Sequence, residues 1–268
     1  MFVHSYSTIG TREKNEDYIK IILNCKNDFL DNLDILAIFD GHGGSYISEL
    51  LSKSLPPFFY NKIPFKKTFD NYVKKLYVCF QKKILSTYNF AQKQGSTALF
   101  VLISKLNNKL YITTVNLGDC RAIISNKYML AIPLSKDHKP LTYLEKKRIH
   151  KQGGVISIRP DDDPRIGQYS VSRSFGDGEE SFISQEPEII QYEYDNDNFI
   201  VVACDGLWDV LSNQEVIDFV QTYLDVLSIR KNYIETNSDN NIAKKLAEYA
   251  LLKGSTDNVS IVIYFFKN

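Results

Sequence analysis

Four aspartates stand at the ends of apolar, strand-like segments of the chain. Asp40, Asp119 and Asp205 each follow such a segment, and Asp257 lies just before one. If these ends lie together, the carboxylates repel one another and lose hydration unless cations neutralise them. Oxygen ligands without neighbouring histidine or cysteine clusters favour a hard ion, magnesium or manganese, over zinc. Because Asp-Gly pairs are also common in turns, the alternative is that each aspartate only helps to form a turn.

The segments that end at these aspartates are predicted to be strands. β-branched, aromatic and other apolar residues dominate them, and each has the length of a strand in a buried sheet. The predicted strands cover residues 35–39, 97–104, 110–118, 121–125, 198–204 and 259–266.

One long helix is predicted between these strands. Apolar residues from Phe69 to Leu85 recur on one face, while lysines fill the other. The most polar stretch, residues 230–241, is predicted to be a surface loop between the last two helices.

Two further helices are predicted from capping signals. Thr142 with Glu145, and Ser212 with Glu215, have the spacing of capping boxes, in which two side chains satisfy free backbone N–H groups at a helix start. The first of these helices is expected to end at the Gly-Gly pair 153–154.

The order of elements indicates the fold class. Strands and helices follow one another without a regular βαβ alternation, which favours an α+β fold with mainly antiparallel sheets. A chain of 268 residues with 44% hydrophobic content can bury a sizeable core. With no internal repeat and no interdomain linker, a single domain over residues 1–268 is expected.

Charge and cysteine content restrict the partners and the compartment. Lysine plus arginine (32) balance aspartate plus glutamate (32), so no net field attracts nucleic acid or an anionic membrane. The four cysteines lack C-x-x-C spacing and are expected to be small buried hydrophobes in a reducing compartment. No apolar run approaches the roughly 20 residues that span a bilayer, and Phe2 excludes N-myristoylation. We expect a cytoplasmic or nuclear protein that does not insert into membranes.

The motifs together resemble those of the metal-dependent protein phosphatases of type 2C. The stretches that carry the resemblance occur in the family's order along nearly the whole chain: TREKNEDY, FDGHGG, GSTALFVLI, VNLGDCRAII, LSKDHKP, EKKRIHKQGG, SVSRSFGD, EPEI, FIVVACDGLWDVLS and STDNVSIVIYFF. The resemblance implies two antiparallel β-sheets packed as a sandwich, flanked on both faces by α-helices. It also implies a metal site in a cleft at one edge, where the strand-end aspartates converge.

The resemblance assigns metal-binding roles to individual residues. It implies that Asp40 bridges two metal ions and that the backbone carbonyl of Gly41 binds one of them, where glycine allows the main chain to approach closely. Glu16 matches a ligand of one ion, and Asp17 a ligand or a group that orients bound water. The remaining implied ligands are Asp205 and Asp257 for the other ion, and Asp119 and Asp209 for a weaker third.

Two further residues match catalytic positions of the family. Arg12 resembles the arginine that holds the substrate phosphate, since a planar guanidinium binds two oxygens at once. His42 resembles the proton donor to the leaving oxygen. The implied reaction is hydrolysis of phosphoserine or phosphothreonine in proteins by a metal-activated water, without a phosphoenzyme. None of the cysteines lies in a C-x5-R loop, which argues against a cysteine mechanism.

Each assignment has a simpler structural alternative. Arg12 and Glu16 would form a surface charge pair, Asp119 would bind Arg121 or a turn, and His42 would be a hydrogen-bonded turn residue. For the function, the alternative is a catalytically weak pseudophosphatase that acts as a phosphoprotein-binding scaffold. With either function, the protein is expected to be monomeric.

The stretch from residue 157 to 177 carries further expectations. Arg173 and Asp177 are predicted to be a structural pair rather than catalytic groups. The acidic residues 161–164 lack EF-hand spacing and are predicted to form a solvated loop. Residues 157–173 correspond to the flap beside the family's active site, but residues 165–169 depart from the family's pattern, so substrate choice is not implied.

Overall fold

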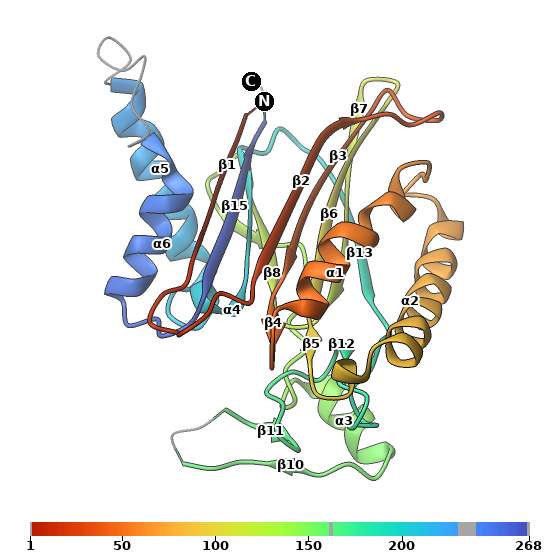
Figure 1. Cartoon of the computed structure of the whole chain (residues 1–268). Coiled ribbons are helices and arrows are strands. Elements are labelled where there is room, and N and C mark those ends of the chain that lie inside the picture. Colours follow the sequence, from red (N-terminus) through yellow and green to blue (C-terminus); the bar gives the residue numbers. More distant parts are fainter. Residues whose placement is uncertain (1, 161–162, 230–239, 267–268) are drawn as a thin grey trace.

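Two five-stranded antiparallel sheets stand face to face in the computed structural model, which describes residues 2–160, 163–229 and 240–266 (Figure 1). Sheet I contains, in spatial order, β1 (Phe2–Thr8), β15 (Val259–Phe265), β14 (Phe199–Ala203), β8 (Arg121–Ser125) and β9 (Ala131–Pro133). Sheet II contains β13 (Glu188–Glu193), β7 (Lys109–Leu117), β6 (Ala98–Leu106), β3 (Asn32–Phe39) and β2 (Tyr18–Cys25). The predicted α+β class with antiparallel sheets is confirmed.

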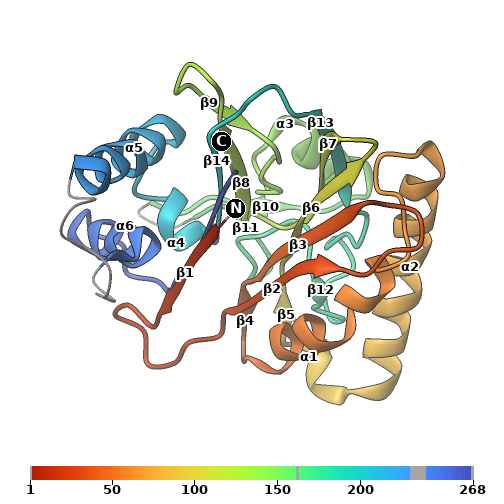
Figure 2. The ribbon, with the colours of Figure 1, turned by 90° about the horizontal axis from the view of Figure 1, so that it is seen from above.

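Helices cover the outer face of each sheet (Figure 2). Sheet II packs on α1 (Tyr46–Ser54) and α2 (Lys67–Thr87), and sheet I packs on α5 (Asn213–Ile229) and α6 (Ile242–Leu252). Short 3-10 turns, η1 (Pro56–Phe59) and η2 (Asn89–Gln92), flank α2. The chain therefore has the four layers, helix, sheet, sheet and helix, that the resemblance implied.

Smaller elements gather at one end of the sandwich (Figure 1). They are α3 (Tyr143–Lys151), the hairpin of β10 (Ile156–Ser157) and β11 (Arg165–Ile166), the four-residue helix α4 (Asp205–Trp208), and a three-stranded sheet of β12 (Phe175–Gly176), β5 (Gly95–Ser96) and β4 (Gly41–His42). This end carries the site described below.

The central strands are buried on both faces. In β3, Leu33, Ile35 and Phe39 pack toward α1 and α2, while Leu36 and Ile38 pack toward sheet I. Such strands have continuous apolar sequences instead of alternating ones. All the predicted strands are present for this reason, with small differences at their ends.

The sequence did not indicate the strands at the edges of the sheets. β1 and β9 are the edges of sheet I, and β13 and β2 are the edges of sheet II. Their residues are all partly buried or exposed, so none of these sequences needs a continuous apolar run.

The two capping predictions had opposite outcomes. The backbone N–H of Ser212 donates to Glu215 at 2.8 Å, and the N–H of Glu215 donates to the Ser212 hydroxyl at 3.3 Å, so this capping box is confirmed. Helix α3 begins after Thr142 and ends before Gly153 as expected, but without a side-chain cap. The capping box of Thr142 and Glu145 is wrong because the Glu145 carboxylate is buried against two arginines.

Other expectations have mixed outcomes. The amphipathic helix is confirmed as α2. Cys120 and Cys204 are buried, but Cys25 is partly exposed and Cys79 is exposed, so the expectation of four buried cysteines is wrong. The predicted loop 230–241 lies mostly outside the described residues. Among the helices of the described part, none combines the length and apolar character needed to cross a bilayer.

Candidate metal centre

A cleft of about 940 Å³ opens at the end of the sandwich. It is lined by most of the residues that the resemblance singled out: Arg12, Glu16, Asp40, Gly41, His42, Asp119, Asp205, Asp209 and Asp257. Asp17 lies beneath this surface, where one oxygen each of Asp17 and Asp40 and the sulfur of Cys204 all lie within 4.8 Å of one another. The strand-end carboxylates therefore converge.

Asp40 is fixed where β3 ends. Its backbone N–H donates to the Thr97 hydroxyl at 3.0 Å, and the N–H of Thr97 donates to the Asp40 carbonyl at 2.9 Å. At the next residue, Gly41, a Cβ would lie 2.5 Å from the Glu16 carbonyl oxygen and 2.6 Å from Ser48 Oγ. Only glycine fits at this position, because the loop that carries Glu16 packs directly on the backbone.

Asn258 holds this loop against the start of β15. Its side-chain oxygen accepts from the N–H of Glu16 at 2.9 Å, and its Nδ2 donates to the carbonyls of Ile9 and Lys14, both at 2.9 Å. The guanidinium of Arg12, which is largely exposed, forms an ion pair with Asp257 at 2.6 Å. The alternative in which Arg12 pairs with Glu16 is therefore wrong.

The buried carboxylates of the cleft form no ion pair with the described residues, unlike Asp257 and Asp209. Asp17 Oδ2 and both oxygens of Asp119 are buried and have no hydrogen-bond partner among the described residues. Burial raises the pKa of Asp17 to about 6 and that of Asp119 to about 6. Burial, and then the charges of neighbouring aspartates, raise the pKa values of Asp40 and Asp205 well above the ordinary range. Such a cluster disfavours its own ionisation until a cation binds.

Asp119 does not serve the structural alternative considered for it. Arg121 instead donates to Asp137 at 2.9 and 2.6 Å and to Asn213 at 2.7 Å. Asp209, which is half exposed, lies nearer the rim and pairs with Lys139 at 2.7 Å. Asp119 is thus a buried carboxylate without a hydrogen-bond partner in the part of the chain that the structure describes, although the charge of Lys139 acts on it, whereas Asp209 binds Lys139 directly.

His42 pairs with Asp177. Its Nε2 lies 2.9 and 2.7 Å from the two carboxylate oxygens. Burial alone would lower the pKa of the His42 imidazole, but the hydrogen bond and charge of Asp177 outweigh it and raise this pKa. The predicted pairing of Arg173 with Asp177 is wrong, since Arg173 binds Glu145.

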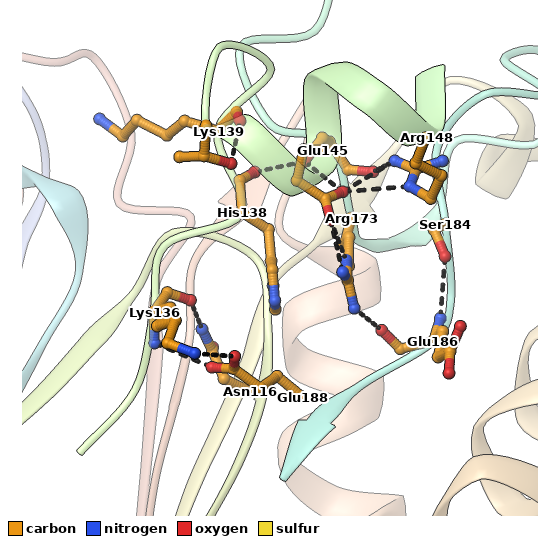
Figure 3. A network of polar contacts seen from close by, with 12 residues as sticks. Asn116, Lys136, His138, Lys139, Glu145, Arg148, Arg173, Ser184, Glu186 and Glu188 are labelled. Atoms are coloured by element: carbon orange, nitrogen blue, oxygen red, sulfur yellow. Dashed lines mark hydrogen bonds and ion pairs between the residues drawn. The ribbon is translucent and has the colours of Figure 1, made fainter. Parts of the chain in front are cut away.

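A second buried acidic group, Glu145, lies between Arg148 and Arg173 (Figure 3). Its carboxylate accepts from Arg148 Nη2 at 2.9 Å, from Arg173 Nε at 3.0 Å and from the Ser172 hydroxyl at 2.9 Å. Burial would raise the pKa of Glu145, but Arg173 and then Arg148 hold it at about 2. Nearby, the buried His138 accepts at Nδ1 from the N–H of Gly118 at 3.1 Å, beside Asp119. This network ties α3 and the chain after the flap to the backbone that carries Asp119.

The flap lies over the cleft. Its hairpin, β10 and β11, packs through Ile166 and Tyr169 against Ile149 of α3. Arg165, Gln168 and Tyr169 line the cleft, as does Asp163, which is exposed as expected of a solvated loop. Residues 161–162 of that acidic stretch lie outside the described residues.

A family model described as protein phosphatase 2C matches residues 3–259. The chain belongs to the protein phosphatase 2C family. It is 31% identical over 268 residues to "Probable protein phosphatase 2C 62" of Oryza sativa, covering 98% of this chain and 86% of that protein. It is 30% identical over 279 residues to "Protein phosphatase 1L" of Bos taurus, covering 98% and 72%. A mimivirus "PP2C-like domain-containing protein R307" is 43% identical over 169 residues, covering 58% of this chain and 94% of that protein.

Solved structures agree on the fold of this phosphatase 2C family member. Serine-threonine phosphatase 2C from Toxoplasma gondii gives a TM-score of 0.77 at 20% identity, covering 99% of this chain and 94% of that one. A Caenorhabditis elegans sex determining protein gives a TM-score of 0.80 at 23% identity, covering 100% and 65%. The family is one of protein serine/threonine phosphatases that are typically metal-dependent.

Three features of this phosphatase's cleft were not assigned from the sequence. Cys204 contributes the sulfur beside Asp17 and Asp40, and its position directly before Asp205 was the available signal. Lys139, from the stretch LSKDHKP, faces Asp209. Asp177 contacts His42 although the two residues are 135 positions apart in the sequence, and no local pattern indicates this contact.

Proposed function

We propose that this protein hydrolyses phosphoserine and phosphothreonine in proteins at a binuclear magnesium or manganese site in the cleft. One observation carries the proposal: buried carboxylate oxygens without hydrogen-bond partners converge on an open cleft. Uncompensated buried charge of this kind is costly unless cations bind there. A donor set of carboxylates and a carbonyl, beside the sulfur of Cys204, fits hard divalent ions.

The residues that would hold the ions come from five places in the chain. Asp40 would bridge the two ions, with the Gly41 carbonyl and Glu16 on one of them and Asp17 beside them as a ligand or a group that orients water. Asp205 and Asp257 would complete the second, and Asp119 with Asp209 would bind a weaker third. When bound, these ions would acidify water and neutralise charge on the phosphoryl group.

Arg12 is the group proposed to hold the phosphate. Its Nε and Nη2 are engaged by the Thr256 carbonyl and by Asp257, and its Nη1 has no hydrogen bond to the part of the chain that the structure describes. Because the side chain is 57% exposed, this nitrogen is accessible to a phosphate oxygen. Asp257 thereby fixes the guanidinium beside the carboxylates.

The chemistry proposed for the remaining groups is direct hydrolysis. Water attacks phosphorus in line with the departing serine or threonine oxygen, and His42 at the cleft surface gives that oxygen a proton. No covalent enzyme intermediate is needed.

The test is hydrolysis of a phosphothreonine peptide with manganese or magnesium, and its loss in chelator. The matched control for ligand variants is Asp34→Asn, because Asp34 is a buried aspartate in the same strand that leads to Asp40 but binds Tyr264 and the Asn24 backbone outside the cleft. The Asp34→Asn protein is expected to hydrolyse the peptide, and the Asp205→Asn protein to lose both manganese binding and turnover. Phosphopeptide binding without any turnover would instead support the pseudophosphatase.

A further inference from the structure

Three short strands place His42 and Gly176, the residue before Asp177, on either side of Gly95. In the sheet of β12, β5 and β4, Gly95 is opposite His42 on one side and opposite Gly176 on the other. His42 and Asp177 come from regions 135 residues apart, so this small sheet determines that they meet.

Gly95 leaves the space that their contact needs. A Cβ at this position would lie 2.6 Å from Asp177 Cγ and closer still to His42 Nε2. Gly95 is not among the residues with positive φ, so its backbone would accept another residue. Only the space between the two side chains requires glycine here.

The Asp177 carboxylate is fixed by several contacts. The Ser174 hydroxyl donates to its Oδ2, and its own N–H donates to the Gln94 carbonyl at 3.2 Å. Gln81, a buried polar residue of α2, binds the N–H and the carbonyl of Gly176 at 2.9 and 2.6 Å. These bonds, all within the chain, hold the turn that carries Asp177.

The two ends of the imidazole have different surroundings. Nε2 contacts Asp177, whose side chain is fully buried, whereas the His42 side chain is 28% exposed and lines the cleft. Nδ1 has no hydrogen-bond partner among the described residues. We propose that Asp177 is a positioning residue, which accepts the Nε2–H bond and so directs Nδ1 of His42 at the leaving oxygen of the substrate. This inference rests on the hydrolase function proposed above.

The proton balance of the step follows from this geometry. As the bond from phosphorus to the serine or threonine oxygen breaks, Nδ1 of the protonated ring gives its proton to that oxygen, and the oxygen of the attacking water forms the new bond to phosphorus. The ring is left neutral with its remaining proton on Nε2, toward Asp177, which stays ionised. Solvent takes one proton from the water and returns one to Nδ1.

The test compares two substrates and a double-mutant cycle. His42→Ala is expected to slow hydrolysis of a phosphothreonine peptide by roughly 10²-fold, and of p-nitrophenyl phosphate by about tenfold or less, because nitrophenolate leaves without a proton. Asp177→Asn is expected to slow the peptide by about tenfold or more and the aryl phosphate by about threefold or less. In the His42→Ala background, Asp177→Asn is expected to cost about twofold or less, since its effect acts through the ring.

Two further variants distinguish a positioning role of Asp177 from a general structural role. Gly95→Ala is expected to show the same selective loss on the peptide, because its methyl group separates the pair. Asp34 is a buried aspartate outside the cleft, so Asp34→Asn is expected to lose little activity, and to the same extent on both substrates. Losses from His42→Ala and Asp177→Asn that multiply in the double variant, or equal losses on both substrates, would overturn the proposal.

Nitrogen NMR of the histidine rings tests the pair without turnover. The chain has four histidines, so the His42→Ala spectrum identifies the signals of His42. A protonated Nε2 whose signal shifts in Asp177→Asn is the expected result, and an unshifted signal would overturn the pairing. If the parent shows no metal-dependent hydrolysis, the proposed function fails, while these spectra still decide whether Asp177 orients the ring.

Discussion

Asp119 in the cleft and Glu145 in its network are both buried acidic groups, but they differ in what neutralises them. Glu145 accepts bonds from Arg148, Arg173 and Ser172, and its pKa lies at about 2. Neither oxygen of Asp119 has a hydrogen-bond partner among the described residues, and burial raises its pKa to about 6 despite the charge of Lys139. The first arrangement stabilises the folded chain by itself, whereas the second costs stability and is suited to bind an external cation.

Removing a carboxylate from the cleft should abolish activity and leave the fold intact. Asp40→Asn is expected to lower turnover of a phosphothreonine peptide by about 10³-fold or more and to remove manganese binding in calorimetry. The strands of the core are unchanged, so circular dichroism should match the parent. Parent-like manganese affinity in this variant would show that the cleft is not the metal site.

Removing the carboxylate of the Glu145 network should instead lower the stability of the fold. Glu145→Gln leaves two partly buried arginines without their anion and is expected to lower the free energy of unfolding by about 3 kcal/mol. Burial disfavours the ionised carboxylate of Glu145, but the two arginines outweigh burial and lower its pKa to about 2 in the folded chain. The stabilisation is thus present above the unfolded pKa of about 4.3 and is lost as pH falls toward 2. Urea titrations at pH 7 and pH 3 measure both effects, and an unchanged stability at pH 7 would contradict the comparison.

Manganese should stabilise the parent and leave the Asp40→Asn protein unaffected. An ion that binds only the folded cleft contributes about 2.7 kcal/mol at a hundredfold excess over its Kd. Melting curves with manganese and with chelator measure this difference. Coincident curves for the parent would argue against a preformed site.

Neutralising Asp119 should stabilise the metal-free protein. Its folded pKa of about 6 lies above the unfolded value near 3.9, so the ionised carboxylate destabilises the fold above about pH 6. In chelator at pH 8, Asp119→Asn is expected to raise the free energy of unfolding by about 2 kcal/mol, and the gain should disappear as pH falls from 6 to below 4. A loss of stability at pH 8 would mean that Asp119 has a structural partner.

How far the sequence predicted the fold depended on burial. Strands such as β3, covered on both faces, have continuous apolar sequences and were predicted, whereas the edge strands β1 and β2 were not. A helix start with a true capping box, at Ser212, was predicted with its contacts. At Thr142 the same spacing was misleading, because Arg173, which is distant in the sequence, binds Glu145 instead. Local spacing cannot indicate such a contact.

The same limit applies to the site. The strand-end aspartates were visible in the sequence, but their convergence came from the resemblance and is seen only in the fold. The partners of Arg173 and Asp177 were wrongly predicted because four residues of separation suggested a pair, while each side chain binds a group from another element. Long-range contacts between single polar residues leave no periodic pattern to detect.

The hydrogen bonds by which Asn258 holds the loop of Glu16 also affect the order in which the cleft can form during synthesis. Asn258 binds Glu16 across 242 residues, and β15, which follows it, separates β1 from β14 in sheet I. Sheet II can pair as soon as residue 193 has left the ribosome, but β1 and the loop that carries Arg12 have no partner until β15 emerges. A growing chain therefore has no complete carboxylate cleft until β15, the last strand among the described residues, has emerged.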